Sequence, residues 1–358
     1  MKKKPGKTFI NNAVTYLMVI AAFVVMSFLM EKGMLSRSMK GQLVPICVYV
    51  VMAVSLNLTV GISGELSLGH AGFMSVGAFS GVIAAAVLAG PVPGAVLRLI
   101  LAMLVGGMMA TLAGVVIGVP VLRLRGDYLA IVTLAFGEII RNVINCLYIG
   151  LDGNRLVFAF NTPIAQDPAR TAQGIPFQVL VNGPQGAAVT QKLASFAMGF
   201  ALVIFSLIVV LNLINSRSGR AIKALRDNRI AAESVGISAT KYKMMAFVIS
   251  AALAGMAGAL YALNYSTVTA GKFKFDTSIL VLVFVVLGGI GNIRGSIIAA
   301  ALLTVLPELL RAFNDYRMLV YAVVLILVMV ISNSEGLKQL KENVLKKLGR
   351  SRGSKGGV

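Results

Sequence analysis

Long apolar runs are the feature that most constrains the fold of this chain. A run of about 20 apolar residues is long enough to cross the hydrocarbon core of a bilayer as a helix. A transmembrane β-barrel would instead alternate apolar and polar residues over short segments. Charged residues make up 13% of the chain, which is about half of the fraction typical of a soluble domain. The sequence therefore predicts an all-α polytopic membrane protein with about ten transmembrane or re-entrant helices.

The apolar runs define a predicted membrane domain at residues 13–333. The run at 278–290 is short for a span, so we expect it either to cross the membrane or to re-enter it under cover of protein. The first run follows four lysines, as in a signal peptide, but no A-x-A-type cleavage site comes after it, so we expect it to be retained. The predicted spans are Ala13–Met30, Leu43–Val60, His70–Ala89, Leu97–Val119, Tyr128–Ile149, Ala194–Asn215, Met244–Tyr265, Ser278–Ile290, Ser296–Leu310 and Leu319–Ile331.

The distribution of basic residues predicts the orientation of these spans. The stretch 216–243 holds seven Lys and Arg residues in 28, whereas the stretch 150–193 holds three in 44. Cytoplasmic loops carry the excess of Lys and Arg in membrane proteins. We therefore expect a bacterial inner-membrane protein with 1–12, 216–243 and the basic tail 334–358 in the cytoplasm, and with 150–193 as an extracytoplasmic loop. Both termini are then cytoplasmic.

Composition argues against several other classes of protein. A net charge of +20 would suggest nucleic-acid binding in a soluble protein, but here the basic residues lie beside apolar runs and Trp is absent. Anionic lipid of the bilayer explains the charge better. Cys47 and Cys146 lie inside apolar runs without metal-ligand spacing, and His70 is the single histidine of the sequence. We therefore expect no metal site and no nucleic-acid partner.

The sequence also lacks the signatures of an enzyme. It has no G-x-x-x-x-G-K-[ST] phosphate loop, and the glycine-rich stretch 288–292 lacks the lysine of that motif. No side chains form a recognisable set of nucleophile, base and orienting group. The sequence predicts no enzyme activity, no catalytic residues and no cofactor bound by this chain.

The predicted cytoplasmic stretch contains signals for a short helix. Asp227 or Asn228 is suited to cap a helix at Ile230–Val235, and Gly236 is suited to end it. A short charged helix at the membrane surface is suited to docking on a soluble partner. A solvated linker that simply obeys the positive-inside rule is the alternative.

Two glycine-rich breaks interrupt the apolar runs, one at 61–72 and one at 287–295. Glycine-interrupted hydrophobic segments in the two halves of a chain point to a transport pathway, because they free backbone groups for a solute. Tight packing between helices is the alternative. The candidate path residues in these breaks are Gly64, Glu65, Ser67, Gly69, His70, Gly288, Gly289, Gly291 and Asn292.

The fifth predicted span carries a polar face made of Glu138, Arg141, Asn142 and Asn145. At 100° per residue these side chains fall on one side of the helix. Charged groups inside a membrane usually face the interior of a helix bundle or water, so these residues are candidates for the path as well. A Glu138–Arg141 pair that neutralises itself and holds helices together is an equal alternative.

Three motifs, in order along the chain, resemble those of LivM-type branched-chain amino acid ABC transporter permeases. Residues 61–73 resemble the G-x-x-G-x-L-S-L-G-H-A-x-F motif of that family. Residues 220–236 resemble its cytoplasmic loop, with the pattern R-D-N/D-x-x-A-A-E-x-x-G. Residues 287–296 resemble its L-G-G-x-G segment. The resemblance covers about residues 40–330.

This resemblance implies an assembly around the chain. Its partners would be a LivH-like second permease subunit, two cytoplasmic ATPase subunits that use ATP, and an extracytoplasmic solute-binding protein. The cytoplasmic loop would be the ATPase-coupling loop. Its residues in this sequence are Arg220, Asp227, Arg229, Ala231, Ala232, Glu233 and Gly236.

The function implied is translocation of leucine, isoleucine or valine that a binding protein delivers. Relatives in the family are assigned to urea, short amides and other small polar solutes, so the solute stays open. A self-sufficient secondary transporter is an alternative, with Glu65 and Glu138 as candidate ion sites. A scaffold without transport activity is a further alternative.

Overall fold

The structure is a computed structural model that describes residues 7–34, 36–124, 126–152, 155–163, 177–189, 191–310, 316, 319–323, 325–326 and 330. The chain divides into two compact units, Met1–Thr304 and Val305–Val358. The helices and the sheet discussed below belong to the first unit. In the second unit residues 319–323 are helical. The basic tail and much of the last predicted span lie outside the described residues.

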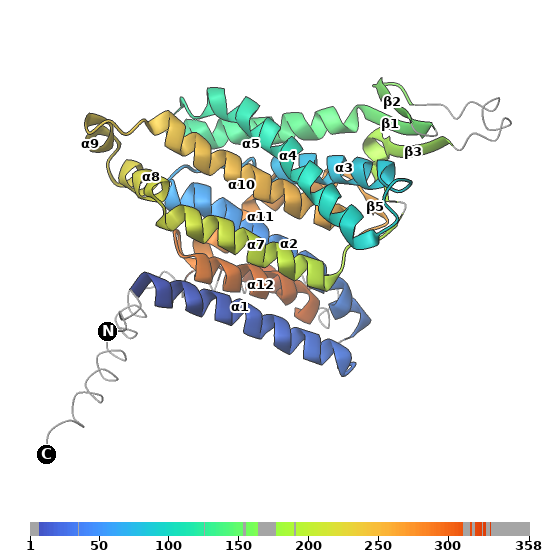
Figure 1. The fold of residues 1–358 in the computed structure, drawn as a ribbon, viewed down its shortest axis with the longest axis horizontal. Coiled ribbons are helices and arrows are strands. Elements are labelled where there is room, and N and C mark those ends of the chain that lie inside the picture. The colour runs from blue at the N-terminus through green and yellow to red at the C-terminus, as the bar shows by residue number, and fades with distance from the viewer. Residues whose placement is uncertain are drawn as a thin grey trace, which may run out of the picture. The chain divides into compact units, whose positions relative to one another are not determined.

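The chain is mostly helical, as predicted, and Figure 1 shows the arrangement of its elements. A π-helical segment at Leu58–Ile62 continues the second helix. The α-helices are α1 Lys7–Glu31, α2 Arg37–Asn57, α3 His70–Val87, α4 Ala95–Val121, α5 Asp127–Asn145, α7 Phe196–Asn215, α8 Arg217–Asp227, α9 Arg229–Ser234, α10 Ala239–Ala262, α11 Phe275–Gly288 and α12 Ile293–Leu309.

Six helices among the described residues are long and apolar enough to cross a membrane. This confirms a multi-pass membrane protein, but the predicted number of about ten is not confirmed. Two predicted spans are not among the six. Helix α11 is apolar but has only 14 residues, and α5 contains the charged residues Glu138 and Arg141. The six helical segments are Asn12–Glu31, Arg37–Ile62, His70–Val87, Ala95–Val121, Phe196–Asn215 and Ala239–Ala262.

A five-stranded sheet corrects the all-α prediction. Its order is β2-β1-β3-β4-β5, with antiparallel neighbours throughout. The fifth predicted span, expected to reach Ile149, ends as helix at Asn145 and continues as a strand. Aromatic and β-branched residues in this part of the chain favour strands. The strands are β1 Leu147–Asp152, β2 Arg155–Phe160, β3 Phe177–Asn182, β4 Ala187–Ala188 and β5 Thr267–Val268.

Helices α3, α4 and α10 form the most closely packed part of the first unit. Glycines let their backbones approach each other. A Cβ added at Gly77 of α3 would overlap the backbone of Gly255 in α10, and one at Gly258 would overlap the backbone of Met74. The small residues at these positions therefore fix the spacing of the three helices.

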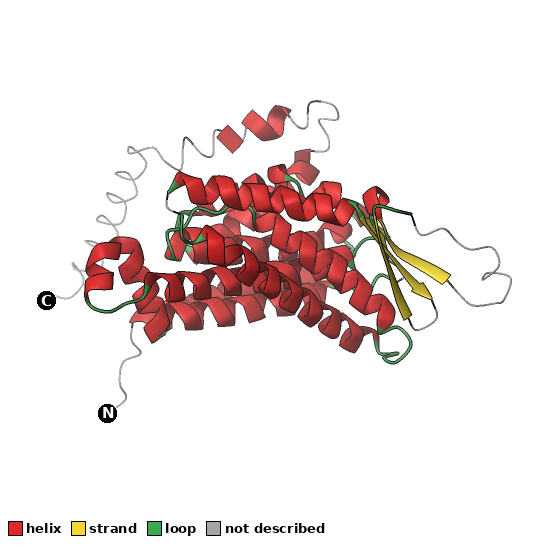
Figure 2. Cartoon of the chain, turned by 90° about the horizontal axis from the view of Figure 1, so that it is seen from above, coloured by secondary structure: helices red, strands yellow, loops and turns green. Residues whose placement is uncertain are grey.

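The sheet and the helices α8 and α9 lie at opposite ends of the first unit (Figures 1 and 2). Helices α2, α3, α4, α7 and α10 run between these two ends. The short strand β5 follows α10 and joins the sheet, so α10 connects the two ends directly. The two ends of the unit are therefore connected by helices that run between them.

We expect Gly77→Ala to destabilise the fold, because its methyl group would overlap the backbone of Gly255 and force α3 and α10 apart. Overpacking of this kind costs about 1–3 kcal/mol. The measurement is the thermal unfolding temperature of the purified chain in detergent, at a fixed scan rate.

The control is Gly41→Ala in α2, where no described atom lies within 4 Å of the added Cβ. Alanine is the better helix former there, so this variant should be as stable as the original chain. Equal unfolding temperatures for the two variants would contradict the proposed role of Gly77.

Candidate functional site

The first glycine break turns the chain between α2 and α3. The π-helical segment ends at Ile62, Gly64 adopts a positive φ of 76°, and α3 begins at His70. A side chain at Gly61 would overlap the amide oxygen of Asn57 and the backbone of Gly291. Only glycine therefore allows the first break to contact the second.

The second glycine break turns the chain between α11 and α12. Helix α11 ends at Gly288, and Gly289 and Gly291 adopt positive φ values of 92° and 84°. L-residues with a side chain rarely adopt such angles. A Cβ at Gly295 would overlap the backbone of Gly288, so the two short helices meet in a tight reversal.

Asn57 joins the two breaks from inside the protein. Its side chain is fully buried. Its Oδ1 accepts a hydrogen bond from the N–H of Gly291 at 2.9 Å, and its Nδ2 donates to Oγ of Ser296 at 2.8 Å. A broken helix leaves backbone groups without partners, and in a membrane protein these must be satisfied by the protein itself. Asn57 performs this role at the second break.

Arg226, near the end of α8, performs the same role at the first break. Its Nη1 donates a hydrogen bond to the carbonyl oxygen of Gly61. The stem of the side chain lies against Gly64, and its Nη1 lies beside Gly291. We call Asn57, Gly61, Arg226 and Gly291 the glycine clamp. It joins a helix at one end of the unit to both breaks in the apolar segments.

An ion pair makes a second connection close to the clamp. Lys243, in the first turns of α10, pairs with Glu65 of the first break. Their side chains are 12% and 11% exposed, and a buried charge of this kind needs such a partner. Glu65 therefore serves to fix the first break to α10 in this structure.

A polar cavity of about 380 Å³ lies beside the clamp. Its walls come from α1, α7, α8 and both breaks. Three basic side chains and one acidic side chain line it, so its net charge is positive. These lining residues are Lys223, Arg226, Arg294 and Asp227.

The other candidate residues of the first break pack inside the protein. His70 is buried, and its Nε2 lies 2.7 Å from Oγ of Ser55 in α2. A Cβ at Gly69 would overlap the carbonyl of Thr133 in α5. Ser67 is buried, and its hydroxyl has no hydrogen-bond partner among the described residues. The structure thus places these residues at helix contacts, while Gly64 and Glu65 lie next to the clamp.

The polar face of α5 is separate from the clamp. Nη2 of Arg141 lies 2.7 Å from Oε2 of Glu138, with both side chains partly exposed. Asn142 is exposed and Asn145 is half-buried. The predicted pair at i, i+3 is therefore present, and the face that carries it lies on the surface of this chain.

The predicted docking helix is present as α9. Oδ1 of Asn228 accepts a hydrogen bond from the N–H of Ala231 at 3.0 Å, so Asn228 rather than Asp227 is its N-cap. Gly236 follows the helix with a positive φ of 85°. Arg229 and Glu233 form an ion pair at 2.9 Å along its surface. Of the other candidate residues, Arg220 and Asp227 are exposed on α8, and Ala231 is exposed on α9.

A small apolar cluster holds α9 to its neighbours. Ala232 packs with Leu225 of α8 and Ala239 of α10. Two large apolar side chains beside this cluster are exposed, since Ile230 of α9 is 83% accessible and Val235, the residue after α9, is 75% accessible. A short helix that is fixed by one cluster and exposes apolar side chains is suited to insertion into a partner's cleft.

Several residues of this site are not predicted by the sequence. Arg226 is one of seven basic residues in the stretch 216–243, and nothing in the sequence distinguishes it from the others. Asn57 interrupts an apolar run, and a polar residue inside a predicted span is a signal that could have identified it. Lys243 and Ser296 carry no local signal, because their partners lie far away in the sequence.

Comparisons with known proteins agree with these features. A family model described as branched-chain amino acid transport system / permease component matches residues 38–329. The high-affinity branched-chain amino acid transport system permease protein LivM of Salmonella typhimurium is 36% identical over 318 residues, which are 86% of this chain and 71% of that protein. LivM of Escherichia coli K12 is 37% identical over 294 residues, which are 79% of this chain and 66% of that protein.

A more distant similarity connects the chain to a second permease protein of the same kind of system. LivH of Salmonella typhimurium is 33% identical over 118 residues, which are 32% of this chain and 38% of that protein. The family model covers most of this chain, and the described part of the matched region contains both glycine breaks and α9. The chain belongs to the permease component family of branched-chain amino acid transport systems.

Proposed function

We propose that this chain is a transmembrane permease subunit of an ABC importer that translocates leucine, isoleucine or valine. The glycine clamp carries the proposal, because it joins surface helices to both breaks in the apolar segments. Family membership and the names of the LivM relatives support the class of solute. The chain provides the path, and partner subunits hydrolyse ATP.

The proposed orientation places α8 and α9 in the cytoplasm and the sheet outside. The density of basic residues in 216–243 supports it. Two ATPase subunits dock on α9 and α8, and an extracytoplasmic binding protein delivers the solute at the end with the sheet. The inner membrane is then the location of the chain, with both termini in the cytoplasm.

The proposed coupling of ATP hydrolysis to transport depends on the attachment of α9 to α8. An ATPase cleft that closes on Ile230 and Val235 would move α9 and α8 together, because Ala232 and Leu225 pack in one cluster. Arg226 would transmit this movement to the two breaks. Coupling of this kind needs a rigid element at a defined position.

The polar face of α5 is the proposed contact with a LivH-like second permease. Glu138 and Arg141 lie at the surface of this chain within an otherwise apolar helix. Charged side chains in a membrane segment face protein or water rather than lipid. A path between the two permeases would use this face. Similarity to LivH supports the existence of such a partner.

The carboxylates argue against a self-sufficient secondary transporter. Both carboxylates considered as ion-coupling sites, Glu65 and Glu138, already have basic partners within the chain. An ion-coupled transporter needs a carboxylate that can exchange its ion during the cycle. Urea, a short amide or another small polar solute is the remaining alternative for the cargo.

The proposed function is tested by uptake of radiolabelled leucine into vesicles that contain the complex purified with this chain. A cysteine is placed at Lys241, and the face from which an impermeant thiol reagent reaches it is identified. Uptake should require ATP on that face and the binding protein on the opposite face. Lys241 is exposed near the start of α10. Uptake by the chain alone in an ion gradient would contradict the proposal, as would a requirement for ATP on the other face.

We expect Arg226→Gln to uncouple ATP hydrolysis from uptake. The variant loses a charge-assisted hydrogen bond to Gly61, which is worth about 1.5–3 kcal/mol, so uptake should fall roughly tenfold or more. Binding-protein-stimulated ATPase activity should persist. The measured ratio of ATP molecules hydrolysed to solute molecules transported should therefore rise.

The matched control is Arg217→Gln, at the exposed first residue of the same helix. It removes one positive charge from α8 but leaves the clamp intact. Equal loss of uptake in both variants would mean that Arg226 acts only through the charge of the loop.

Glu138→Gln should reduce uptake several-fold while the complex still assembles, because the variant changes the charge of the proposed path at a partly exposed site. Asp127→Asn, at the first residue of α5, makes the same chemical change away from the polar face and should retain uptake. The amount of assembled complex is measured alongside. A Glu138→Gln chain that is lost from the complex would favour a structural ion pair instead.

A further inference from the structure

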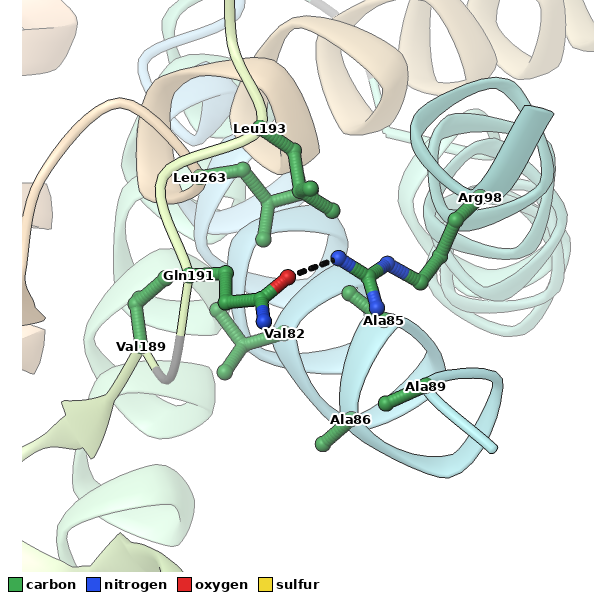
Figure 3. A pocket seen from close by; sticks show the side chains of 9 residues that line it. All are labelled: Val82, Ala85, Ala86, Ala89, Arg98, Val189, Gln191, Leu193 and Leu263. Atoms are coloured by element: carbon green, nitrogen blue, oxygen red, sulfur yellow. Dashed lines mark hydrogen bonds between the residues drawn. The ribbon is translucent and has the colours of Figure 1, made fainter. Parts of the chain in front are cut away.

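A buried arginine without an acidic partner lies at the end of the unit that carries the sheet. Arg98, in the first turn of α4, is 5% exposed. Its Nη2 donates a hydrogen bond to Oε1 of Gln191, as Figure 3 shows. Its Nε has no hydrogen-bond partner among the described residues. No described carboxylate forms an ion pair with it.

This arrangement leaves a positive charge largely uncompensated. A guanidinium group does not deprotonate in proteins. An unpaired charge inside a protein costs several kcal/mol unless an opposite charge or water compensates it. Gln191 is neutral, and its amide satisfies one N–H group of Arg98.

The end of helix α3 lies near this charge. The guanidinium group of Arg98 lies near Ala85 of α3, and Ala86 and Ala89 line the same cavity (Figure 3). A helix C-terminus carries roughly half of a negative charge. This partial charge does not replace a full counter-charge, and Arg98 itself lies in the first turn of α4, at the positive end of that helix.

A small cavity lies where a counter-ion would bind. Its volume is about 40 Å³, and Arg98 and Gln191 are its polar lining residues. The other walls are aliphatic, from Val82, Leu193 and Leu263 among others (Figure 3). One water needs about 10–15 Å³ of such volume. The cavity therefore has room for a halide ion or a carboxylate group, and is too small for a whole amino acid.

We propose that Arg98 and Gln191 bind one small monovalent anion, either a free halide or the carboxylate group of a small organic acid. The amide of Gln191 would turn its Nε2 toward the anion, and the guanidinium N–H groups of Arg98 that line the cavity would donate to it. The site does not depend on the transport activity proposed above.

The anion would also fix Gln191, which lies between the sheet and α7 in the sequence, with Val189 and Leu193 near it. The N–H of Val189 donates to the carbonyl of Ser266 at 2.8 Å, and that of Leu193 donates to the carbonyl of Leu263 at 3.2 Å. Arg98 adds a third attachment through Gln191. Binding of the anion should therefore raise the stability of the folded chain by mass action.

The test uses the full chain, purified with its associated subunits and placed in uncharged lipid nanodiscs. Chloride replaces the bulky sulfonate buffer anion MES, which is neither a halide nor a carboxylate, at constant ionic strength while the unfolding temperature is measured. We expect a saturable rise of about 2–4 °C. Acetate is titrated in the same way, because a response to acetate but not chloride would identify carboxylate as the ligand. No response to either anion would mean that water satisfies Arg98, and would overturn the proposal.

Two variants and a control make the test specific. Arg98→Gln should abolish the response. Gln191→Glu places a carboxylate beside the guanidinium, so it should raise the unfolding temperature in the sulfonate buffer and remove the response to added anion. Arg37→Gln, an exposed arginine at the start of α2, should respond like the original chain. A response that survives in Gln191→Glu or in Arg98→Gln would place the anion elsewhere and overturn the proposal.

Discussion

Broken apolar helices need internal partners for the backbone groups that they free. In water such groups bind solvent, but in a bilayer each unsatisfied group costs several kcal/mol. Here the carbonyl of Gly61 accepts a hydrogen bond from Arg226, and the N–H of Gly291 donates one to Asn57. Both breaks are satisfied by the same small set of side chains. Movement of one break therefore disturbs the hydrogen bonds of the other.

The breaks contrast with the helices around them. Gly77 and Gly255 bring α3 and α10 into backbone contact, and close contacts of this kind resist sliding. At the breaks, Gly64 and Gly289 adopt positive φ angles, where glycine has more conformational freedom than other residues. The unit thus combines a closely packed group of helices with two turns whose conformation favours glycine. Glycine places fewer steric limits on a change of conformation at these turns than at the helix contacts.

Local signals were read correctly from the sequence, whereas long-range ones were not. The N-cap and the terminating glycine of α9 depend on residues within one helical turn, so the sequence narrows the cap to Asp227 or Asn228 and identifies Gly236 as the end of the helix. The bond from Arg226 to Gly61 joins residues that are 165 positions apart, and no local pattern encodes it. The pairing of β4 with β5 is long-range in the same way, because the whole of α10 lies between them in the sequence. Strands β1 and β2 pair locally, but the apolar residues of β1 also continue the apolar run of α5, so the sequence predicts a longer helix there. The ion pair of Glu138 lies within one turn and was predicted.

Glu65, Glu138 and Arg98 differ in how the chain compensates their charge. Glu65 is neutralised by a buried lysine, so it needs nothing from outside the chain. Glu138 is paired but lies at the surface, where lipid would be an unfavourable neighbour. Arg98 is buried with a neutral partner and an adjacent cavity. A charge that a chain does not compensate by itself marks a place where another molecule completes the structure. By this argument Arg98 points to a small anion. Helix α5 points to a second protein subunit for a different reason, because its ion pair would otherwise face lipid.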